Sequence, residues 1–334
     1  MNQLSDYDFE LPDDRIAQVP LADRAASRLL WLHRESGLTE HRSFREVPQI
    51  LRPGDLLVVN DTRVSAVRVK GHKATGGAVE ALLLHEVAHG TYEAMVKPGR
   101  RLPDGTRIEL AGMAATVEGR GGIRIVRFDP SPDLKVRLAE AGETPLPPYI
   151  HERLPDAERY QTSYAREEGS AAAPTAGLHF TAEIIEDLRA RGIEVARVTL
   201  HVGIDTFKPL QTENLDEHQM HGEVCEVPTA TAEALSRCTG RIVAVGTTTV
   251  RTLESFATGP RKIRPGRMRS SLFIRPGFEF QIVDGMFTNF HLPRTTMLAM
   301  ISALAGYDEV RRAYAAAIEE RYRFLSFGDS MLIL

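Results

Sequence analysis

Cysteine is almost absent from this sequence. Cys225 and Cys238 are the only two among 334 residues, and no CxxC pair occurs, so neither a disulfide framework nor a cysteine zinc site is expected. No apolar run approaches the ~18 residues that a membrane-spanning helix requires. The acidic opening MNQLSDYDFELPDD also lacks the apolar core of a signal peptide. These absences predict a cytoplasmic protein that makes no contact with a membrane.

An overall positive charge is also lacking, since the formal net charge is −4. The charge is unevenly distributed, however. Residues 62–128 contain 11 Lys and Arg against 6 Asp and Glu, whereas the rest of the chain is acidic. A basic segment inside an acidic chain is typical of a surface that binds a polyanion. So small an excess also fits an ordinary solvated surface, and the sequence leaves both interpretations open.

The length and the residue pattern predict two domains, because a chain of 334 residues favours about two. Residues 62–128 form six short runs of alternating apolar and polar residues, which is typical of a small barrel or sandwich. On either side the chain shows alternating strand and helix patterns. We therefore predict an α/β domain with a mixed sheet, formed by residues 1–61 and 145–334. Residues 62–144 are predicted to be an inserted antiparallel β-barrel.

Local signals predict individual elements of the α/β domain. Two short runs around Glu35-Ser36-Gly37 predict a hairpin. Residues 272–290 predict two strands, residues 308–322 an amphipathic helix, and residues 331–334 a final strand.

The stretch 171–207 combines a loop, a helix and a strand. Thr181 is a suitable N-cap, and residues 193–202 alternate like a strand. Because this strand runs back along the helix, its end at His201 returns to the edge where the helix began, beside His179. This edge is where α/β proteins bind ligands.

The same order of strand end, polar loop and helix start recurs at residues 174–181, 246–251 and 289–296. If the strands are parallel neighbours, the three loops share one edge. In 246–251 a glycine followed by three threonines presents N–H groups and hydroxyls to an anion, although a plain helix cap explains it equally well. The polar residues 60–63 follow another strand. They can be interpreted either as a capped turn or as part of the site.

Histidines are the main candidates for acid–base chemistry, because imidazole titrates near neutral pH. The informative positions are His179, His201, His291 and the pair His218 and His221. Residues three apart can share a helix face and bind a metal, but the HExxH arrangement of zinc peptidases is missing. A general base or an oriented hydrogen-bond donor explains the histidines better, and a metal site stays an alternative.

Taken in order, these segments resemble one enzyme family over nearly the whole chain. The motifs are YDFELP (7–12), SRLLWLHRESGLTEHRSF (27–44), LRPGDLLVVNDTRV (51–64), PLPPYI (145–150), ERYQTSYARE (158–167), AAPTAGLHFT (172–181), VTLHVG (198–203), HQMHGE (218–223), VGTTTVRTLES (245–255), TNFHLPRTT (288–296) and RYRFLSFGDSMLIL (321–334). The sequence resembles the S-adenosylmethionine:tRNA ribosyltransferase-isomerases of queuosine biosynthesis.

The resemblance implies a reaction and its partners. The ribosyl part of S-adenosylmethionine is transferred and isomerised onto 7-aminomethyl-7-deazaguanine at the wobble position of tRNA. The products are epoxyqueuosine-tRNA, adenine and methionine. The resemblance also implies an α/β domain carrying an inserted barrel, and no metal. We expect a monomer whose basic barrel contacts the tRNA.

The implied reaction makes chemical demands that can be mapped onto residues as hypotheses. A base must remove a ribose C5′ proton, which the sulfonium acidifies, and the candidates are His179, His201, His218, His221 and Glu223. Protonation of the departing adenine is assigned to Asp61 or a histidine. The methionine carboxylate is expected near Thr247, Thr248 and Arg251. The other expected substrate-binding residues are Asn60, Thr62, Arg63, Pro174, Thr175, Gly177, Phe180, Gly246, Asn289 and His291.

The sequence departs from the family at a few positions. The family usually has Gly where this chain has Asp205, Ser where it has Gly222, and an IPAR-like pattern at residues 64–67. A tRNA-binding relative without catalytic activity therefore stays open. A metal-dependent hydrolase that uses the histidine cluster is a second open alternative.

Overall fold

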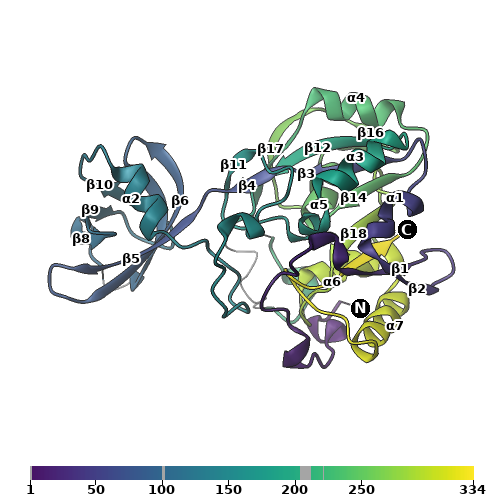
Figure 1. The fold of residues 1–334 in the computed structure, drawn as a ribbon, viewed down its shortest axis with the longest axis horizontal. Helices are drawn as coiled ribbons and strands as arrows, with labels where there is room; N and C mark the ends of the chain where they lie inside the picture. Colours follow the sequence, from purple (N-terminus) through teal and green to yellow (C-terminus); the bar gives the residue numbers. More distant parts are fainter. Residues whose placement is uncertain (1, 100–101, 204–211, 221) are drawn as a thin grey trace.

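The computed structural model describes residues 2–99, 102–203, 212–220 and 222–334, and it contains a large α/β unit and a small β-barrel (Figure 1). The elements of the large unit are β1 Arg28–Leu32, β2 Thr39–Ser43, α1 Val47–Ile50, β3 Leu56–Asn60, β4 Thr62–Val64, β11 Glu167–Ser170, α3 Ala182–Ala190, β12 Glu194–Leu200, β13 Glu223–Val227, α4 Thr229–Arg237, β14 Ile242–Val245, α5 Thr247–Ser255, β15 Ala257–Gly259, β16 Lys262–Ile263, β17 Gly266–Ser270, β18 Gly285–Asn289, α6 Thr296–Ala305, α7 Tyr307–Glu319 and β19 Ser330–Ile333. Among the described residues, no helix is both long enough and apolar enough to cross a bilayer.

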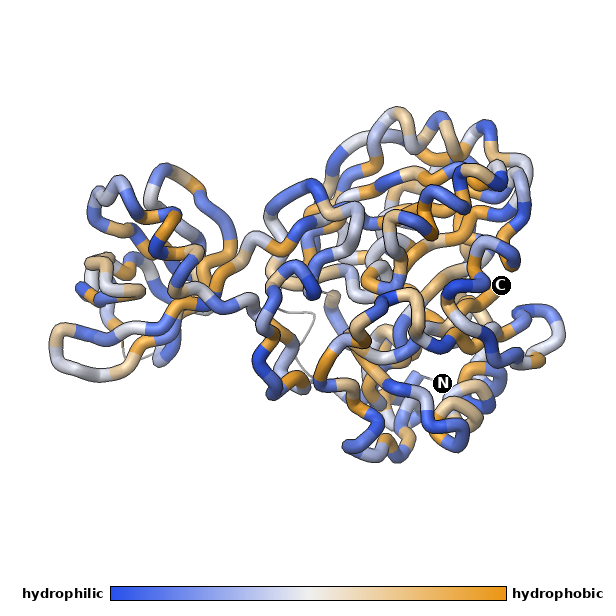
Figure 2. Tube along the Cα trace, viewed as in Figure 1, coloured by the Kyte–Doolittle hydropathy of each residue, from blue (hydrophilic) through white to orange (hydrophobic). Residues whose placement is uncertain are grey.

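The large unit is built on a nine-stranded mixed sheet with the order β17-β13-β12-β3-β14-β18-β19-β1-β2. Its centre, β12-β3-β14-β18, is parallel. Strands β3 and β14 are buried along their whole length, as expected for parallel strands covered on both faces. Apolar residues concentrate along these central strands (Figure 2). The predicted mixed α/β architecture is confirmed.

The sheet separates two hydrophobic cores, and alternate residues of β3 point into each. Leu57 and Val59 pack in the core that α3 covers, through Ile184, Ile185 and Leu188. Leu56 and Val58 pack in the larger core, to which α4, α5, α6 and α7 contribute. The period of two along the strand therefore places helices on both faces of the sheet.

The second unit is a closed barrel of six antiparallel strands with the order β10-β7-β6-β5-β8-β9. These strands are β5 Val67–Lys73, β6 Ala78–Ala88, β7 Thr91–Lys97, β8 Thr106–Leu110, β9 Met113–Glu118 and β10 Arg124–Phe128. The helix α2 (Leu134–Ala141) completes the barrel core through Leu134 and Leu138. All six predicted strands are confirmed. The first residues of the range predicted for the insertion form β4, which pairs with β11 instead of the barrel.

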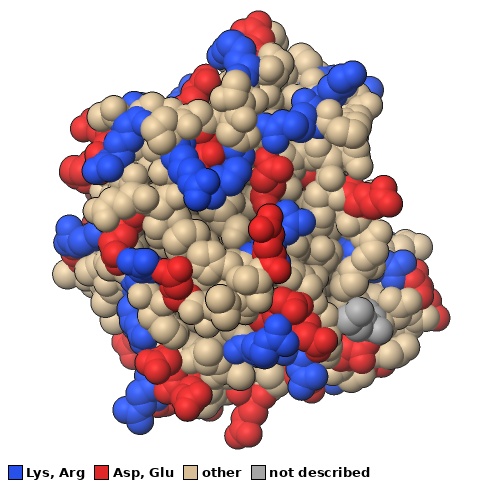
Figure 3. Space-filling view, turned by 90° about the vertical axis from the view of Figure 1, so that its right-hand side faces the viewer, with Lys and Arg blue, Asp and Glu red and all other residues tan. Residues whose placement is uncertain are grey.

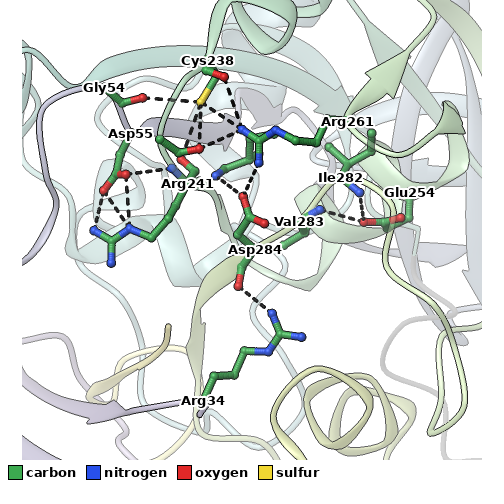
Figure 4. Close-up of polar contacts among 12 residues, drawn as sticks. Arg34, Gly54, Asp55, Cys238, Arg241, Glu254, Arg261, Ile282, Val283 and Asp284 are labelled. Carbon is green, nitrogen blue, oxygen red and sulfur yellow. Dashed lines mark hydrogen bonds and ion pairs between the residues drawn. The ribbon is translucent and has the colours of Figure 1, made fainter.

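Most other local predictions are confirmed, including the β1–β2 hairpin, α3 with its Thr181 cap, α7 and β19. The prediction of two strands in residues 272–290 is wrong, because only β18 forms there. The backbone N–H groups of Ile282 and Val283 donate to the Glu254 carboxylate at 3.0 and 2.9 Å (Figure 4). A buried side chain thus replaces the partner strand that the alternating pattern implied.

Ion pairs hold together the amino-terminal ends of the parallel strands. Asp55, just before β3, is buried and binds the Arg241 guanidinium beside the start of β14 (Figure 4). Asp284 pairs with Arg261 at 2.9 Å and accepts the N–H of Ile242. These contacts lie at the amino-terminal edge of the parallel strands, opposite the carboxyl-terminal edge where α/β proteins bind ligands.

Candidate active site

A cavity of about 930 Å³ lies between the carboxyl-terminal edge of the sheet and the barrel. Small-molecule sites usually measure about 300–1,000 Å³, so this cavity is large enough for a substantial ligand. The sheet side of its wall comes from the residues after β12, the start of β13 and the start of α5. The barrel contributes Leu84, His85, Glu93, Met95, Gly122 and Ile123.

His201 lies on this wall, directly after β12. Its Nδ1 atom is 2.9 Å from Oγ1 of Thr62, and that hydroxyl in turn donates to the carbonyl of Glu167 at 3.4 Å. When the hydroxyl donates to Glu167, Nδ1–H of His201 donates to the hydroxyl and Nε2 carries the lone pair. Burial, and then the positive charge of Arg267, lower the pKa of His201, which keeps the ring neutral.

Glu223 and Arg251 form a buried ion pair on the same wall. Oε1 of Glu223 also accepts the N–H of Gly203 at 2.8 Å. Burial lowers the pKa of Arg251 to about 10. Arg251 comes from α5, whose first two residues, Thr247 and Thr248, also line the cavity. The wall therefore combines a helix N-terminus, a cation and a carboxylate.

The histidine pair can be placed only in part. His218 lines the cavity, and its ring packs edge-to-face on Phe273 with centroids 5.4 Å apart. His221 and Asp205 lie outside the described residues. In the part of the chain that the structure describes, no three His, Cys, Asp or Glu side chains gather in a way that could hold a metal ion.

The structure does not place His179 in the large cavity. The ring is buried, and Nδ1 is 2.8 Å from Ser27 Oγ while Nε2 is 3.3 Å from Asn289 Nδ2. It lines only a small cavity of about 20 Å³, which has room for about one water molecule. Burial lowers the pKa of His179 to about 3, so the ring is neutral.

His291 is half-buried and is held by contacts within the fold. Its Nε2 atom lies 2.8 Å from Thr288 Oγ1, and its backbone N–H donates to the Tyr314 hydroxyl at 2.9 Å. Burial lowers the pKa of His291 to about 4. These contacts join β18 to α7, and His291 is not among the residues that line the large cavity.

The polar residues after β3 lie beneath the cavity wall. Asn60 donates to the Leu200 carbonyl and to Thr248 Oγ1, both at 3.1 Å, and so joins β3, β12 and α5. Asp61 is buried, accepts from Thr199 Oγ1 at 2.8 Å and pairs with Arg166. Burial raises the pKa of Asp61. Arg63 forms an ion pair with Glu158.

The loop that carries the AAPTAGLHFT motif folds as a short helix, η7 (Thr175–His179), against the end of β18. Thr175 donates to Asn289 Oδ1 at 2.9 Å. A Cβ on Gly177 would lie 2.0 Å from the Tyr164 hydroxyl, so a larger residue would force the Tyr164 side chain to move. The remaining predicted residues have structural roles. Pro174 precedes η7, and Phe180 packs on Phe44 and Phe287. Gly246 caps α5 with a φ of +88°.

Sequence reasoning missed the cavity residues of the barrel and of β17. The β17 contribution is Arg267 and Arg269. A signal for it exists, since residues 261–275 contain six Lys and Arg and no Asp or Glu.

The comparisons with known proteins agree with this architecture. A family model described as "Queuosine biosynthesis protein" matches residues 4–333. Proteins named S-adenosylmethionine:tRNA ribosyltransferase-isomerase are similar over 99% of this chain and 100% of their own length. Those of Symbiobacterium thermophilum and Moorella thermoacetica are 51% and 49% identical to it.

A solved structure is similar as well. The crystal structure of S-adenosylmethionine tRNA ribosyltransferase from Thermotoga maritima is 39% identical and has a TM-score of 0.58, covering 98% of this chain and 100% of that one. The likeness extends through both the α/β unit and the barrel. The chain therefore belongs to the queuosine biosynthesis family of S-adenosylmethionine:tRNA ribosyltransferase-isomerases.

Proposed function

We propose that the cavity between the barrel and the sheet edge is the place where this chain carries out the reaction of its family. The ribosyl moiety of S-adenosylmethionine is transferred and isomerised onto 7-aminomethyl-7-deazaguanine at the wobble position of tRNA. Epoxyqueuosine-tRNA, adenine and methionine are the products. S-Adenosylmethionine is thus a substrate, and tRNA is the macromolecular partner.

One observation carries this proposal: both units of the chain form the wall of one large cavity. The reaction must bring a nucleoside-sized donor and a nucleotide of a tRNA loop together. A volume of about 930 Å³ supports the presence of both. We also propose that the active species is a cytoplasmic monomer that requires no metal.

His201 is the proposed general base. Carbon C5′ of the donor is bonded to a sulfonium, so its protons are acidic enough for a neutral imidazole to remove one. The pKa of His201 is lowered, which supports a neutral ring, and the contact of Nδ1 with Thr62 leaves Nε2 to take the proton. His179 lacks access to the large cavity, which supports His201 over His179 for this role.

The start of α5 is the proposed site of the methionine carboxylate. Thr247 and Thr248 offer hydroxyls and N–H groups at the positive end of the helix, and Arg251 adds a cation. We assign proton donation to the departing adenine to His218, because it lines the cavity while Asp61 is enclosed beneath the wall. Glu223 holds Arg251 in place.

The decisive experiment combines purified protein, S-adenosylmethionine and tRNA that carries the 7-aminomethyl-7-deazaguanine precursor. Released adenine and the modified nucleoside are followed by mass spectrometry. We expect both to form in equal amounts, to be unaffected by a chelator, and to disappear in His201→Ala. Binding of tRNA without release of adenine would reject the enzymatic function, and loss of activity on chelation would favour the metal-dependent alternative.

A further inference from the structure

Most of the described basic side chains in residues 62–128 pair with neighbouring carboxylates. Arg107 forms two contacts with the Asp129 carboxylate at 2.7 and 2.6 Å, and Arg127 forms two with Glu118 at 3.0 and 3.1 Å. Further carboxylate pairs are Arg63–Glu158, Arg68–Glu80, Lys70–Glu143 and Lys97–Glu80. The excess charge that the sequence places in this segment is therefore a weak guide to where a polyanion binds.

A different basic segment borders the cavity. Residues 261–275 contain six Lys and Arg and no acidic residue. Within it, β17 is the terminal strand of the large sheet, on the side of the α/β unit that faces the barrel (Figure 1). Figure 3 shows the other end of the molecule, away from the barrel, where basic and acidic side chains are intermixed.

The strand alternation of β17 directs two arginines to the cavity. Arg267 and Arg269 are exposed and line it, whereas Met268 between them packs against the hydrophobic core. Residues two apart on a strand are separated by roughly 6.6 Å, so the two guanidinium groups form a short row. Such a row suits successive phosphates of one nucleic-acid strand.

Both arginines are tied to the proposed reaction centre. The charge of Arg267 acts on His201, since it contributes to lowering the pKa of that imidazole. The Arg269 side chain lies over Gly222, where an added Cβ would be 2.6 Å from its Nε atom. Gly222 directly precedes Glu223, which pairs with Arg251. The two arginines therefore lie close to the proposed base, His201, and to the proposed methionine carboxylate site at Arg251.

We propose that Arg267 and Arg269 bind backbone phosphates of the tRNA next to the nucleotide that reacts. This inference rests on the proposed function, because it takes tRNA as the substrate. One guanidinium group can bind two oxygens of the same phosphate, and such contacts do not depend on the identity of the base. The contacts fix the position of the anticodon loop over the cavity, while the barrel forms the other wall.

The test measures tRNA binding by Arg267→Gln, Arg269→Gln and the double variant over a series of salt concentrations. Each single change should weaken binding roughly tenfold at low salt, as expected for a lost charged hydrogen bond. The slope of log K against log salt should fall by roughly 1.5 in the double variant, because each phosphate contact contributes about 0.7–0.9. In turnover assays the KM for tRNA should rise, with no change in the KM for S-adenosylmethionine.

Two further variants serve as controls. Arg264→Gln removes a charge from the same segment at an exposed position outside the cavity wall, and should keep the wild-type salt slope. The double variant with lysine at 267 and 269 retains both charges and should recover most of the slope. Recovery by lysine also shows that weaker binding in the glutamine variants does not reflect misfolding.

Three results would overturn the inference. The first is a wild-type salt slope in the glutamine double variant. The second is a rise in the KM for S-adenosylmethionine alone, which would assign the arginines to the donor carboxylate. The third is self-association without a change in tRNA binding, which would mean that the arginines only protect the sheet edge. If wild-type protein releases no adenine but the salt slopes change as expected, the proposed function fails while phosphate binding by Arg267 and Arg269 is supported.

Discussion

The Thr62 hydroxyl and the His201 imidazole are joined at 2.9 Å across two segments that lie 139 residues apart in the sequence. The hydroxyl also lies 3.4 Å from the Glu167 carbonyl oxygen, to which it can donate. In that arrangement Nδ1–H of the ring donates to Thr62, and the basic nitrogen Nε2 is left available. We propose that Thr62 is a positioning residue for the proposed base.

Replacing Thr62 with Val tests this relationship, because valine keeps the shape and removes the hydroxyl. We expect kcat to fall roughly tenfold to hundredfold, since a misoriented base loses part of the usual acid–base contribution of about 10²–10⁴. Thr62→Ser should restore most of the rate. The KM for S-adenosylmethionine should stay near the wild-type value. A valine variant with wild-type kcat would remove Thr62 from the mechanism.

Gly169 supports the same ring from another side. Its φ is +137°, and a Cβ there would lie 3.0 Å from Cε1 and 3.1 Å from Nδ1 of His201. Gly169→Ala should therefore displace the imidazole and lower kcat. Gly259→Ala is the matched control, because Gly259 has a φ of +154° and an added Cβ would meet nothing within 4 Å. Equal losses of activity in both variants would attribute the effect to backbone strain alone.

The proposed base also predicts a pH dependence. His201 must be neutral to accept a proton, so the rate should rise as the pH increases through its pKa. Burial lowers that pKa below 6.5, Arg267 and His85 lower it further, and Glu167 and Glu226 oppose them. The acid limb of kcat/KM should therefore have its midpoint below pH 6.5.

Variants of the charged residues around His201 predict in which direction the pH midpoint should move. Arg267→Gln removes a charge that lowers the pKa of His201, so the midpoint should move to higher pH. Glu226→Gln removes a charge that raises it, so the midpoint should move to lower pH. Profiles that are identical in wild type and both variants would show that another group controls the acid limb.

Sequence patterns could predict the fold because its driving forces are local and periodic. The continuous apolar runs of β3 and β14 indicate parallel strands buried on both faces, and the alternation in residues 64–128 indicates the barrel. The failure at residues 272–284 has a non-local cause. The Glu254 carboxylate, supplied by α5, takes the backbone donors that a strand would have used.

The sequence predicts which edge of the sheet carries the candidate site, but not which side chains face the cavity. Strand ends at His201 and Gly246 are visible in the sequence, and the parallel order brings them together. Which histidine faces the cavity depends on distant partners, such as Ser27, which encloses His179. The barrel residues of the cavity wall depend on how the barrel packs against the α/β unit. No local sequence pattern predicts that packing.

His179 should be a stability residue, in contrast to His201. His179→Ala would leave the Asn289 amide and the Ser27 hydroxyl without their partner, and would open a void in the core. We expect a loss of about 2–4 kcal/mol in the free energy of unfolding, measured by urea titration. His201→Ala should abolish turnover with a much smaller loss. Abolished turnover in a fully stable His179→Ala protein would contradict this assignment.

The same measurement has a pH signature. The pKa of His179 is about 3 in the folded chain, against 6.5 for an ordinary histidine. Between these values the unfolded chain binds a proton that the folded chain does not, so stability decreases as the pH falls from about 6.5 toward 3. The alanine variant lacks this contribution. The difference in stability between wild type and variant should therefore shrink as the pH is lowered.

The Glu223–Arg251 pair should separate stability from substrate binding. Both side chains are more than nine-tenths buried, at 8% and 7% exposure, so Glu223→Ala would leave an unpaired charge in the cavity wall. We expect a loss of about 3–5 kcal/mol in the free energy of unfolding. Asp129→Ala, which breaks an exposed pair with Arg107, is the matched control and should cost much less stability.

A double variant, Glu223→Leu with Arg251→Met, removes both charges together. It should recover most of the stability lost in Glu223→Ala, because no unpaired charge remains and the apolar side chains fill the space. Binding of S-adenosylmethionine, measured by calorimetry, should not recover, since the proposed carboxylate partner is gone. A stable double variant that binds S-adenosylmethionine like wild type would leave Arg251 a purely structural role and move the carboxylate site away from α5.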